Sequence, residues 1–329
     1  MDPLLILALL FSFLLTLFFT PVWIKKAKQI GLVWEDMHKK NHSKTIAGSG
    51  GVNILFGFSL GVLLYIAIKT FYFKSTDNLI EVFALLISVF IVGFVGFTDD
   101  LLGWRKGGLS KKSRILLLIF ASIPLMVINA GQSTMLGVDF GILYPLFLIP
   151  LGIVAVSSTF NFIAGYNGLE SGQGILILLG LAYVTWVTGN SWLSIVSLSM
   201  IASLLAFYLF NKYPAKVFPG DVLTYPVGAL IAIIAILGNI EQIAALFFIP
   251  YIIEVILKTR GRLKKESFAK LNENGSLDVP YDKFYGIEHI ALYILKKIKP
   301  SKKVYEKEVV YLINAFQTII IIMVILILL

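Results

Sequence analysis

Long apolar runs recur along the whole chain, and short polar segments separate them. A helix needs about 20 apolar residues to cross a bilayer core about 30 Å thick. A membrane β-strand would instead show segments of about ten residues with alternating polarity. The runs therefore predict an all-α fold, a polytopic membrane bundle of ten helices near residues 3–24, 47–68, 79–98, 114–131, 142–160, 169–188, 190–210, 220–238, 241–257 and 309–329.

The composition agrees with that pattern. Of the 329 residues 58% are hydrophobic and 14% are charged, whereas a soluble domain carries about 25% charged residues. We see no internal repeat and no linker, so residues 1–329 are predicted to form a single membrane-embedded domain. No basic residue precedes the first run, and we expect that run to be retained rather than cleaved as a signal peptide.

The basic residues orient the bundle. The counts of Lys and Arg are six for residues 25–44, five for 105–114, two for 212–216 and 13 for 258–307, which is 26 of the 28 in the chain. The positive-inside rule places these loops in the cytoplasm and the N-terminus outside, and an even number of spans returns the C-terminus outside. Anionic headgroups account for the net charge of +9, so nucleic acid is not expected as a partner.

One long cytoplasmic loop is predicted at about residues 258–308. Within it, Asn274-Gly275 predicts a hairpin turn between two extended pieces, because both residues tolerate a positive φ. Residues 286–298 have helical apolar spacing and are predicted to lie along the membrane surface. The chain has no Cys, which excludes disulfides and thiolate metal sites.

The first polar cluster is GFTDDLLGWRKGGLSKK, residues 96–112. Asp99 and Asp100 end an apolar run, where a charge needs a partner or an ion, and the basic residues after them suit phosphate. Neighbours on a helix point about 100° apart, so the two carboxylates are expected to have different roles. The structural alternative is an ordinary solvated helix end.

The second cluster is NFIAGYNGLESGQG, residues 161–174. Asn161, Asn167 and Glu170 alternate with glycines, a composition that suits backbone lining a ligand cavity. The alternative is a stripe of small residues for close helix packing.

The third cluster is VFPGDVLTYPVG, residues 217–228. Gly220 permits close approach of the backbone, Asp221 begins an apolar run, and Phe218 offers a flat face nearby. A carboxylate at this place is also a common helix cap. What favours function is that the predicted topology places all three clusters on one side of the membrane.

Together these motifs resemble those of the polyprenyl-phosphate N-acetylhexosamine-1-phosphate transferases. The resemblance spans nearly the whole chain: an Asp-Asp pair after the third span, an Asn-rich loop after the fifth, Phe-x-Gly-Asp after the seventh and a long basic loop before the last. The Asn-rich loop and FAKLNENGSLDVPYDKF, residues 268–284, are most similar to the eukaryotic and archaeal branch, which uses UDP-N-acetylglucosamine and dolichyl phosphate. Bacterial members usually have Asn-x-x-Asp-Gly-x-Asp-Gly in that loop.

The resemblance implies roles for residues in the three clusters. Asn161 and Asp221 would hold Mg²⁺, with Mn²⁺ as a substitute, and the substrate diphosphate would complete the coordination. Phe218 would stack on the uracil, Asn167 would bond its edge, and Gly165 would let the base lie close. Glu170 lies in the same loop and is predicted to contact substrate.

The cationic side chains are harder to assign. The resemblance implies that Lys111 or Lys112 meets the diphosphate, and that Asp99 and Asp100 organise the site or activate the lipid phosphate. Ser267 falls where the branch has a phosphate-binding arginine. The candidates to replace that arginine are the basic residues around it, Arg260, Arg262, Lys264, Lys265 and Lys270.

The predicted activity is transfer of N-acetylglucosamine-1-phosphate from the UDP-sugar to a membrane polyprenyl phosphate, with release of UMP, at the cytoplasmic face of the cell membrane. This would make the first lipid-linked sugar diphosphate of a glycan assembly pathway. One alternative is the same reaction with another UDP-amino sugar, including a phospho-muramyl-pentapeptide substrate. A more distant one is a secondary transporter, whose site would lie near the bilayer midplane. The family resemblance also implies a homodimer.

Overall fold

A computed structural model describes residues 3–39, 44–135 and 137–329. The α-helices are α1 (Pro3–Ile30), α2 (Gly51–Ala67), α3 (Leu79–Lys106), α4 (Lys111–Val127), α5 (Ile149–Phe160), α6 (Leu169–Val187), α7 (Ser191–Asn211), α8 (Asp221–Gly238), α9 (Glu241–Phe247), α10 (Ile249–Arg260), α11 (Ile287–Ile298) and α12 (Glu306–Leu328). Two π-helical turns are η1 (Ile68–Tyr72) and η2 (Tyr144–Leu148). Three antiparallel strand pairs are β1 (Val33–Glu35) with β2 (Lys44–Ala47), β3 (Thr134–Met135) with β4 (Val138–Asp139), and β5 (Lys270–Leu271) with β6 (Leu277–Asp278).

The predicted all-α membrane fold is confirmed, whereas the count of ten spans stays a prediction. In the described part of the chain seven helices are long and apolar enough to cross a membrane, and an eighth span forms if α9 and α10 are joined. These two helices meet at 59°. Pro250 lies in the first turn of α10, where its missing N–H cannot continue the hydrogen bonds of α9. The Tyr144–Phe160 helix and the 17-residue α4 are shorter.

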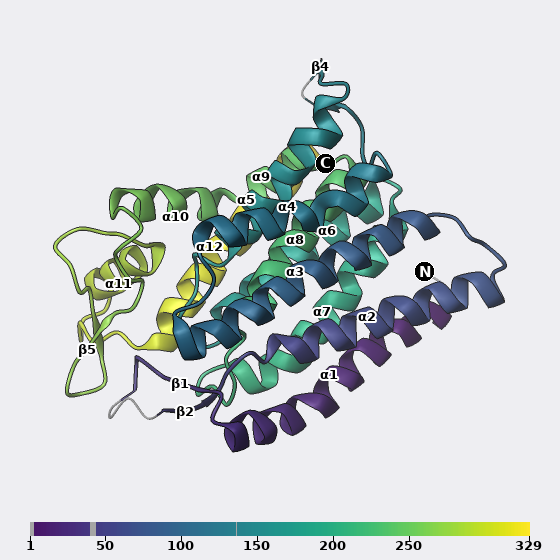
Figure 1. Ribbon diagram of the computed structural model, residues 1–329. Helices are drawn as coiled ribbons and strands as arrows, with labels where there is room; N and C mark the ends of the chain where they lie inside the picture. Colours follow the sequence, from purple (N-terminus) through teal and green to yellow (C-terminus); the bar gives the residue numbers. More distant parts are fainter. Residues whose placement is uncertain (1–2, 40–43, 136) are drawn as a thin grey trace.

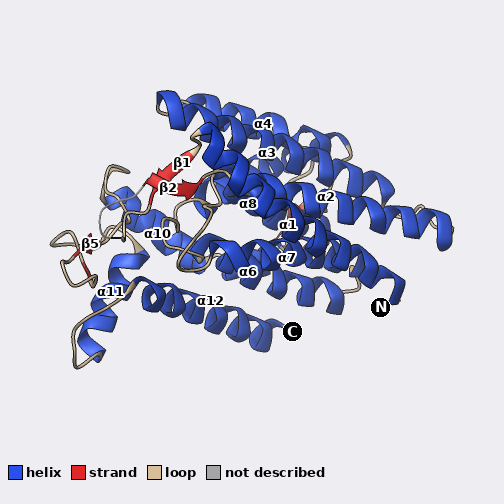
Figure 2. Ribbon diagram, turned by 90° about the horizontal axis from the view of Figure 1, so that it is seen from below, coloured by secondary structure: helices blue, strands red, loops and turns tan. Residues whose placement is uncertain are grey.

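Helix α8 runs through the middle of the bundle (Figures 1 and 2). Of the residues in this helix, 89% are buried, and the helix packs against α3 and α5. Glycines bring these neighbours close: a Cβ on Gly228 would lie 2.7 Å from the backbone of Ser157 in α5, and one on Gly96 would lie 2.3 Å from the carbonyl oxygen of Asp221. The close approach at Gly96 brings Asp99 and Asp100 to the first turn of α8.

The two ends of the bundle differ in character. Both chain termini lie at one end, while the β1–β2 pair, α11 and the β5–β6 hairpin gather at the other (Figures 1 and 2). The three polar clusters of the sequence all lie at the end that carries the β1–β2 and β5–β6 pairs (Figure 1). This arrangement agrees with the expectation that they share one side, which we call the polar end below.

The segment between α10 and α12 contains the predicted hairpin and helix. The β5–β6 pair flanks Asn274-Gly275, but in this turn only Gly275 has a positive φ, of +80°. The Asn274 side chain instead accepts a hydrogen bond from the backbone of Ser276, at 3.0 Å, which holds a longer loop. Helix α11 buries Ile287 and Leu292 and packs on α10 and α12, so one face of it is covered by protein.

Candidate active site

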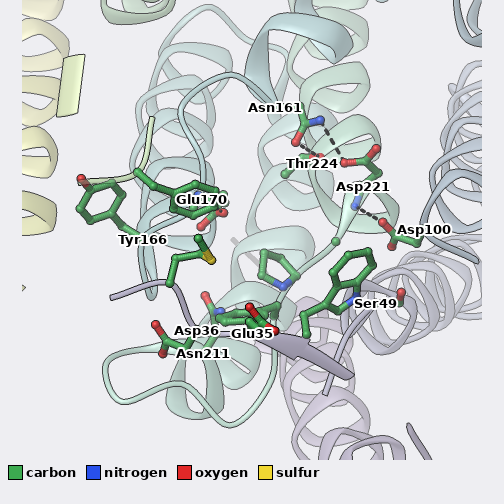
Figure 3. A pocket seen from close by; sticks show the side chains of 17 residues that line it. Glu35, Asp36, Ser49, Asp100, Asn161, Tyr166, Glu170, Asn211, Asp221 and Thr224 are labelled. Carbon is green, nitrogen blue, oxygen red and sulfur yellow. Dashed lines mark hydrogen bonds between the residues drawn. The ribbon is translucent and has the colours of Figure 1, made fainter. Parts of the chain in front are cut away.

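Two adjoining cavities open at the polar end of the bundle. The first has a volume of about 250 Å³ and is shown in Figure 3; the second has a volume of about 480 Å³. Asn161, Gly165 and Phe268 line both of them. The two cavities therefore share a wall that includes the start of the 161–168 loop, and together they form the candidate site.

The two cavities carry opposite charge. The first is lined by five acidic residues and, in the described part of the chain, by no Lys or Arg. These acidic residues are Glu35, Asp36, Asp100, Glu170 and Asp221. The second is lined by four basic residues, Lys111, Arg114, Lys258 and Lys265, against the single acid Glu266. We refer to them below as the acidic cavity and the basic cavity.

Asp100 and Asp221 meet at the start of α8. The Asp100 carboxylate accepts hydrogen bonds from the backbone N–H groups of Asp221 (2.8 Å) and Val222 (3.4 Å), so a side chain from α3 caps the N-terminus of α8. Gly220 makes room for this contact, because a Cβ there would lie 2.2 Å from Asp100 Oδ2. The fold thus uses Asp100 to hold Asp221 at the cavity wall.

Asn161 faces Asp221 across the same corner (Figure 3). Its Nδ2 donates to Asp221 Oδ1 at 3.0 Å, and its Oδ1 accepts from the Thr224 hydroxyl at 3.1 Å. Among the described residues no group of three or more His, Cys, Asp or Glu side chains is arranged to hold a metal ion. One carboxylate and one amide oxygen do match the small protein share that Mg²⁺ takes when phosphates and water supply its other ligands.

Asp99 has a different environment from Asp100. It is buried, and its oxygens accept from the Leu109 N–H at 2.7 Å and from Arg114 Nη2 at 2.6 Å. Arg114 lies in the first turn of α4 and lines the basic cavity. Its guanidinium lies 5.6 Å from the centre of the Tyr225 ring. Asp99 therefore holds a cation and the 107–110 turn in place, whereas different roles for the two aspartates in a reaction stay a prediction.

Aromatic side chains line the acidic cavity. Phe218 lies beside β2, because its N–H donates to the carbonyl of Ala47 at 2.8 Å. Trp34 lines the same cavity and packs against Gly48, where a Cβ would lie 2.5 Å from the indole. Gly165 has a φ of +99° and approaches the ring of Phe268. The cavity thus offers flat apolar faces beside its carboxylates.

Asn167 lies behind the cavity wall rather than on it. Its N–H donates to Glu306 Oε1 at 2.7 Å, and its Nδ2 donates to Asp36 Oδ2 at 3.1 Å and to Glu306 Oε2 at 3.3 Å. Glu170, which does line the acidic cavity, accepts the N–H of Gly165 at 2.9 Å. Both residues shape the 161–168 loop, and direct contact with a substrate stays a prediction for each.

The basic residues predicted from the sequence separate into two groups. Lys111 and Lys265 line the basic cavity. The others are exposed and line neither cavity: Lys112, Arg260, Arg262, Lys264 and Lys270.

Sequence reasoning missed Arg114 and Lys258 on the basic cavity, and Asp36 and Glu306 beside Asn167. Arg114 stands only two residues after Lys112, and Lys258 stands four residues after Glu254, the spacing of a helical ion pair. These spacings were visible signals. The partners of Asn167 had no comparable signal, because Glu306 is 139 residues away in the chain.

Comparison with known proteins places this architecture in a family. Residues 82–239 match the model of glycosyl transferase family 4. A Dictyostelium discoideum protein named UDP-N-acetylglucosamine–dolichyl-phosphate N-acetylglucosaminephosphotransferase is 31% identical over 291 residues, covering 75% of this chain and 70% of its own. A Saccharolobus solfataricus protein that bears the same name provisionally is 38% identical over 300 residues, covering 87% and 88% of the two chains. The chain belongs to glycosyl transferase family 4.

This family 4 chain also matches a more distant group. The phospho-N-acetylmuramoyl-pentapeptide-transferase of Halalkalibacterium halodurans is 28% identical over 287 residues, covering 80% of this chain and 86% of its own. The family match over residues 82–239 includes all three polar clusters of the sequence. The elements that build the two cavities thus coincide largely with the part of the chain that defines the family.

Proposed function

We propose that this chain transfers N-acetylglucosamine-1-phosphate from UDP-N-acetylglucosamine to a membrane polyprenyl phosphate of the dolichyl type. The reaction releases UMP at the cytoplasmic face of the cell membrane. The observation that carries the proposal is the opposite charge of the side chains that line the two adjoining cavities. Carboxylates that line a cavity suit a divalent metal, and gathered cations suit the phosphates of two anionic substrates that must approach each other.

Asn161 and Asp221 are the proposed ligands of Mg²⁺. Asp221 presents Oδ1 toward Asn161, and the Asn161 amide would turn so that its Oδ1 replaces Nδ2 at this point. The ion, when bound, supplies positive charge that offsets the charge growing on the diphosphate. Asp100 keeps the α8 N-terminus and Asp221 in position for this role.

The uridine is assigned to the acidic cavity. Phe218 and Trp34 line it and offer faces for the base, while Gly165, with no side chain, leaves room beside them. The diphosphate then passes the shared wall at Asn161 into the basic cavity. This order places the bond that breaks at the junction of the two cavities.

The chemical step needs positioning more than proton removal. A phosphate monoester carries about −1.5 to −2 charges at pH 7, so its oxygen is already a nucleophile. That oxygen forms a bond to the β-phosphorus, the bond from β-phosphorus to the bridging oxygen breaks, and UMP leaves with that oxygen. Arg114, held by Asp99, is the proposed partner of the acceptor phosphate on the α4 side of the basic cavity.

A third cavity suits the apolar tail of the acceptor. It has a volume of about 410 Å³, lies between α5, α8, α9 and α10, and is lined almost wholly by apolar side chains such as Leu148, Ile231 and Phe248. Thr159 lines this cavity, and its neighbour Ser158 lines the basic cavity. A lipid lying there would place its phosphate at the basic cavity.

The main alternative is the same reaction with a different donor sugar. The relative named as a phospho-N-acetylmuramoyl-pentapeptide transferase favours a larger UDP-amino sugar on the same site. The higher identity to relatives named for UDP-N-acetylglucosamine supports the smaller substrate.

Release of labelled UMP from UDP-N-acetylglucosamine tests the proposal. The purified protein is mixed with a dolichyl phosphate, with and without Mg²⁺, beside a UDP-muramyl-pentapeptide substrate. We expect release that depends on metal and on the lipid. No release with either donor would contradict the proposed function, and release only with the pentapeptide donor would transfer it to the alternative sugar.

A further inference from the structure

Lys258 is the most enclosed cation of the basic cavity. It lies in the last turn of α10, and its side chain is 13% exposed, compared with 30% for Arg114. Lys265 and Lys111 are exposed lysines of the same cavity. The Lys258 ammonium donates to the Ser267 hydroxyl and lies 3.5 Å from Glu254 Oε1. An ammonium has three donors, so at least one remains for a ligand in the cavity.

Glu254, one helical turn before Lys258 in α10, forms an ion pair with this ammonium. It is completely buried, and its Oε2 accepts the N–H of Ile287 at 2.6 Å at the start of α11. The arrangement repeats that of Arg114 and Asp99: a buried carboxylate fixes one side of a cation, and the other side faces the cavity. A cation prepared in this way loses little freedom when it binds an anion.

Two titratable groups of α11 lie near this pair. Burial, together with the negative charge of Glu254, raises the pKa of Glu288 well above its usual value. Burial and the positive charge of Lys258 lower the pKa of His289 to about 4, so the imidazole is neutral.

The position of Lys258 indicates which substrate it meets. Part of the lining of the basic cavity comes from α4 and α5, with Arg114, Ile115 and Ser158. Another part comes from the end of α10 and the segment that follows it, including Leu263, Ser267 and Phe268. Phe268 also lines the acidic cavity, to which the uridine is assigned. Lys258, which is bonded to Ser267 next to Phe268, therefore lies on the part of the lining that continues from the proposed nucleotide site.

We propose that Lys258 binds the β-phosphate of the nucleotide-sugar donor, and that Glu254 is the residue that positions it. This inference rests on the proposed function and adds one element to it: the donor and the acceptor phosphates have separate cations, Lys258 from α10 and Arg114 from α4. Ser267 contributes by holding the ammonium, since its hydroxyl accepts from Lys258.

The test compares donor and product binding in the Lys258→Met variant. A charge-assisted hydrogen bond lost from a buried site predicts a loss of about 10- to 100-fold in kcat/KM for UDP-N-acetylglucosamine. UMP has no β-phosphate, so its inhibition constant should change by less than about twofold, as should the KM of the polyprenyl phosphate. Lys258→Arg should recover part of the loss. Lys303→Met, an exposed lysine of the same segment, is the matched control.

Folding is controlled by a second variant. Lys258→Met alone leaves Glu254 as an uncompensated buried charge, whereas Glu254→Gln with Lys258→Met removes both charges together. The double variant should keep the thermal unfolding midpoint of the wild type and show the same selective loss for the donor. Glu254→Gln alone should lower donor affinity less than Lys258→Met does.

Several results would overturn the inference. One is an equal weakening of UMP and UDP-N-acetylglucosamine, and another is a higher KM for the lipid with the donor unchanged. A double variant that binds the donor normally would also contradict it, while leaving the proposed function intact. Failure of the wild type to release UMP would contradict the proposed function itself, so the two failures are distinguishable.

Discussion

The acidic and basic cavities share a wall but are built in different ways. The acidic cavity takes most of its charged groups from near the ends of packed helices. For example, the backbone N–H of Asp221 in α8 donates to the Asp100 carboxylate of α3 at 2.8 Å. The basic cavity takes two cations from α4 and two from α10 and the segment after it. Rigid helix ends suit a metal site, which tolerates little displacement, whereas long cationic side chains suit phosphates that enter and leave.

The two cavities also differ in how their charges are balanced. Arg114 and Lys258 each have a buried carboxylate behind them. Asp221 accepts a hydrogen bond from the Asn161 amide, and Asp100 accepts from backbone N–H groups. Arg114 and Lys258 are thus each paired with a carboxylate, whereas these contacts of Asp221 and Asp100 come from uncharged groups. Four experiments test this difference.

The largest effect is expected from Asp221→Asn in the acidic cavity. The change removes a proposed metal-ligand charge while keeping the shape, and we expect a loss of about 1,000-fold in UMP release. The concentration of Mg²⁺ that gives half-maximal rate should rise in the same variant, which is measured by titration of the metal. Normal turnover at normal Mg²⁺ would contradict the assignment of Asp221 as a ligand.

Arg114→Met is expected to have the next largest effect. Removing this cation should lower kcat by about 100-fold, because its charge faces the phosphates in the basic cavity. Adding Asp99→Asn to this variant should change the rate by less than about twofold, since Asp99 then has no cation to hold. A larger loss in Lys112→Met than in Arg114→Met would reverse the choice of cation.

The wall shared by the cavities gives a smaller effect. Glu306→Gln weakens two hydrogen bonds that hold Asn167, and the 161–168 loop should shift. We expect the KM for UDP-N-acetylglucosamine to rise about tenfold with kcat nearly unchanged. Glu308→Gln, which loses only a partly exposed ion pair with Lys299, is the matched control. An equal change in both variants would remove the special role of Glu306.

The smallest effect concerns stability behind the basic cavity. The pKa of His289 is about 4 in the folded protein against an ordinary 6.5, so the unfolded chain binds more protons between these pH values. Stability is therefore lost as the pH falls from 6.5 toward 4, by about 1 kcal/mol at pH 5.5. Thermal unfolding midpoints of the wild type should fall more steeply over pH 7.5 to 5.5 than those of His289→Gln. Parallel curves would show that folding does not lower the pKa of His289.

Much of the fold and part of the site followed from the sequence. Apolar run length determined the helical membrane fold, because the cost of unpaired backbone in lipid leaves few alternatives. Alternating spans also predicted that the basic loops and the polar clusters gather at one end. Asp100, Asn161, Phe218 and Asp221, which line the acidic cavity, were predicted as candidates because polar residues and glycines interrupt apolar runs there.

Only the tertiary structure decided which side chains face the cavities. Lys112 and Arg114 are two residues apart, but only Arg114 of this pair lines the basic cavity, because the packing of α4 directs it toward Asp99 of α3. Asn167 meets Asp36 and Glu306, and Lys258 meets Ser267 from another segment, by packing between distant parts of the chain. Hydropathy is a local property of each run, whereas the facing of a side chain depends on how whole helices pack. That physical difference separates what the sequence determined from what only the fold decided.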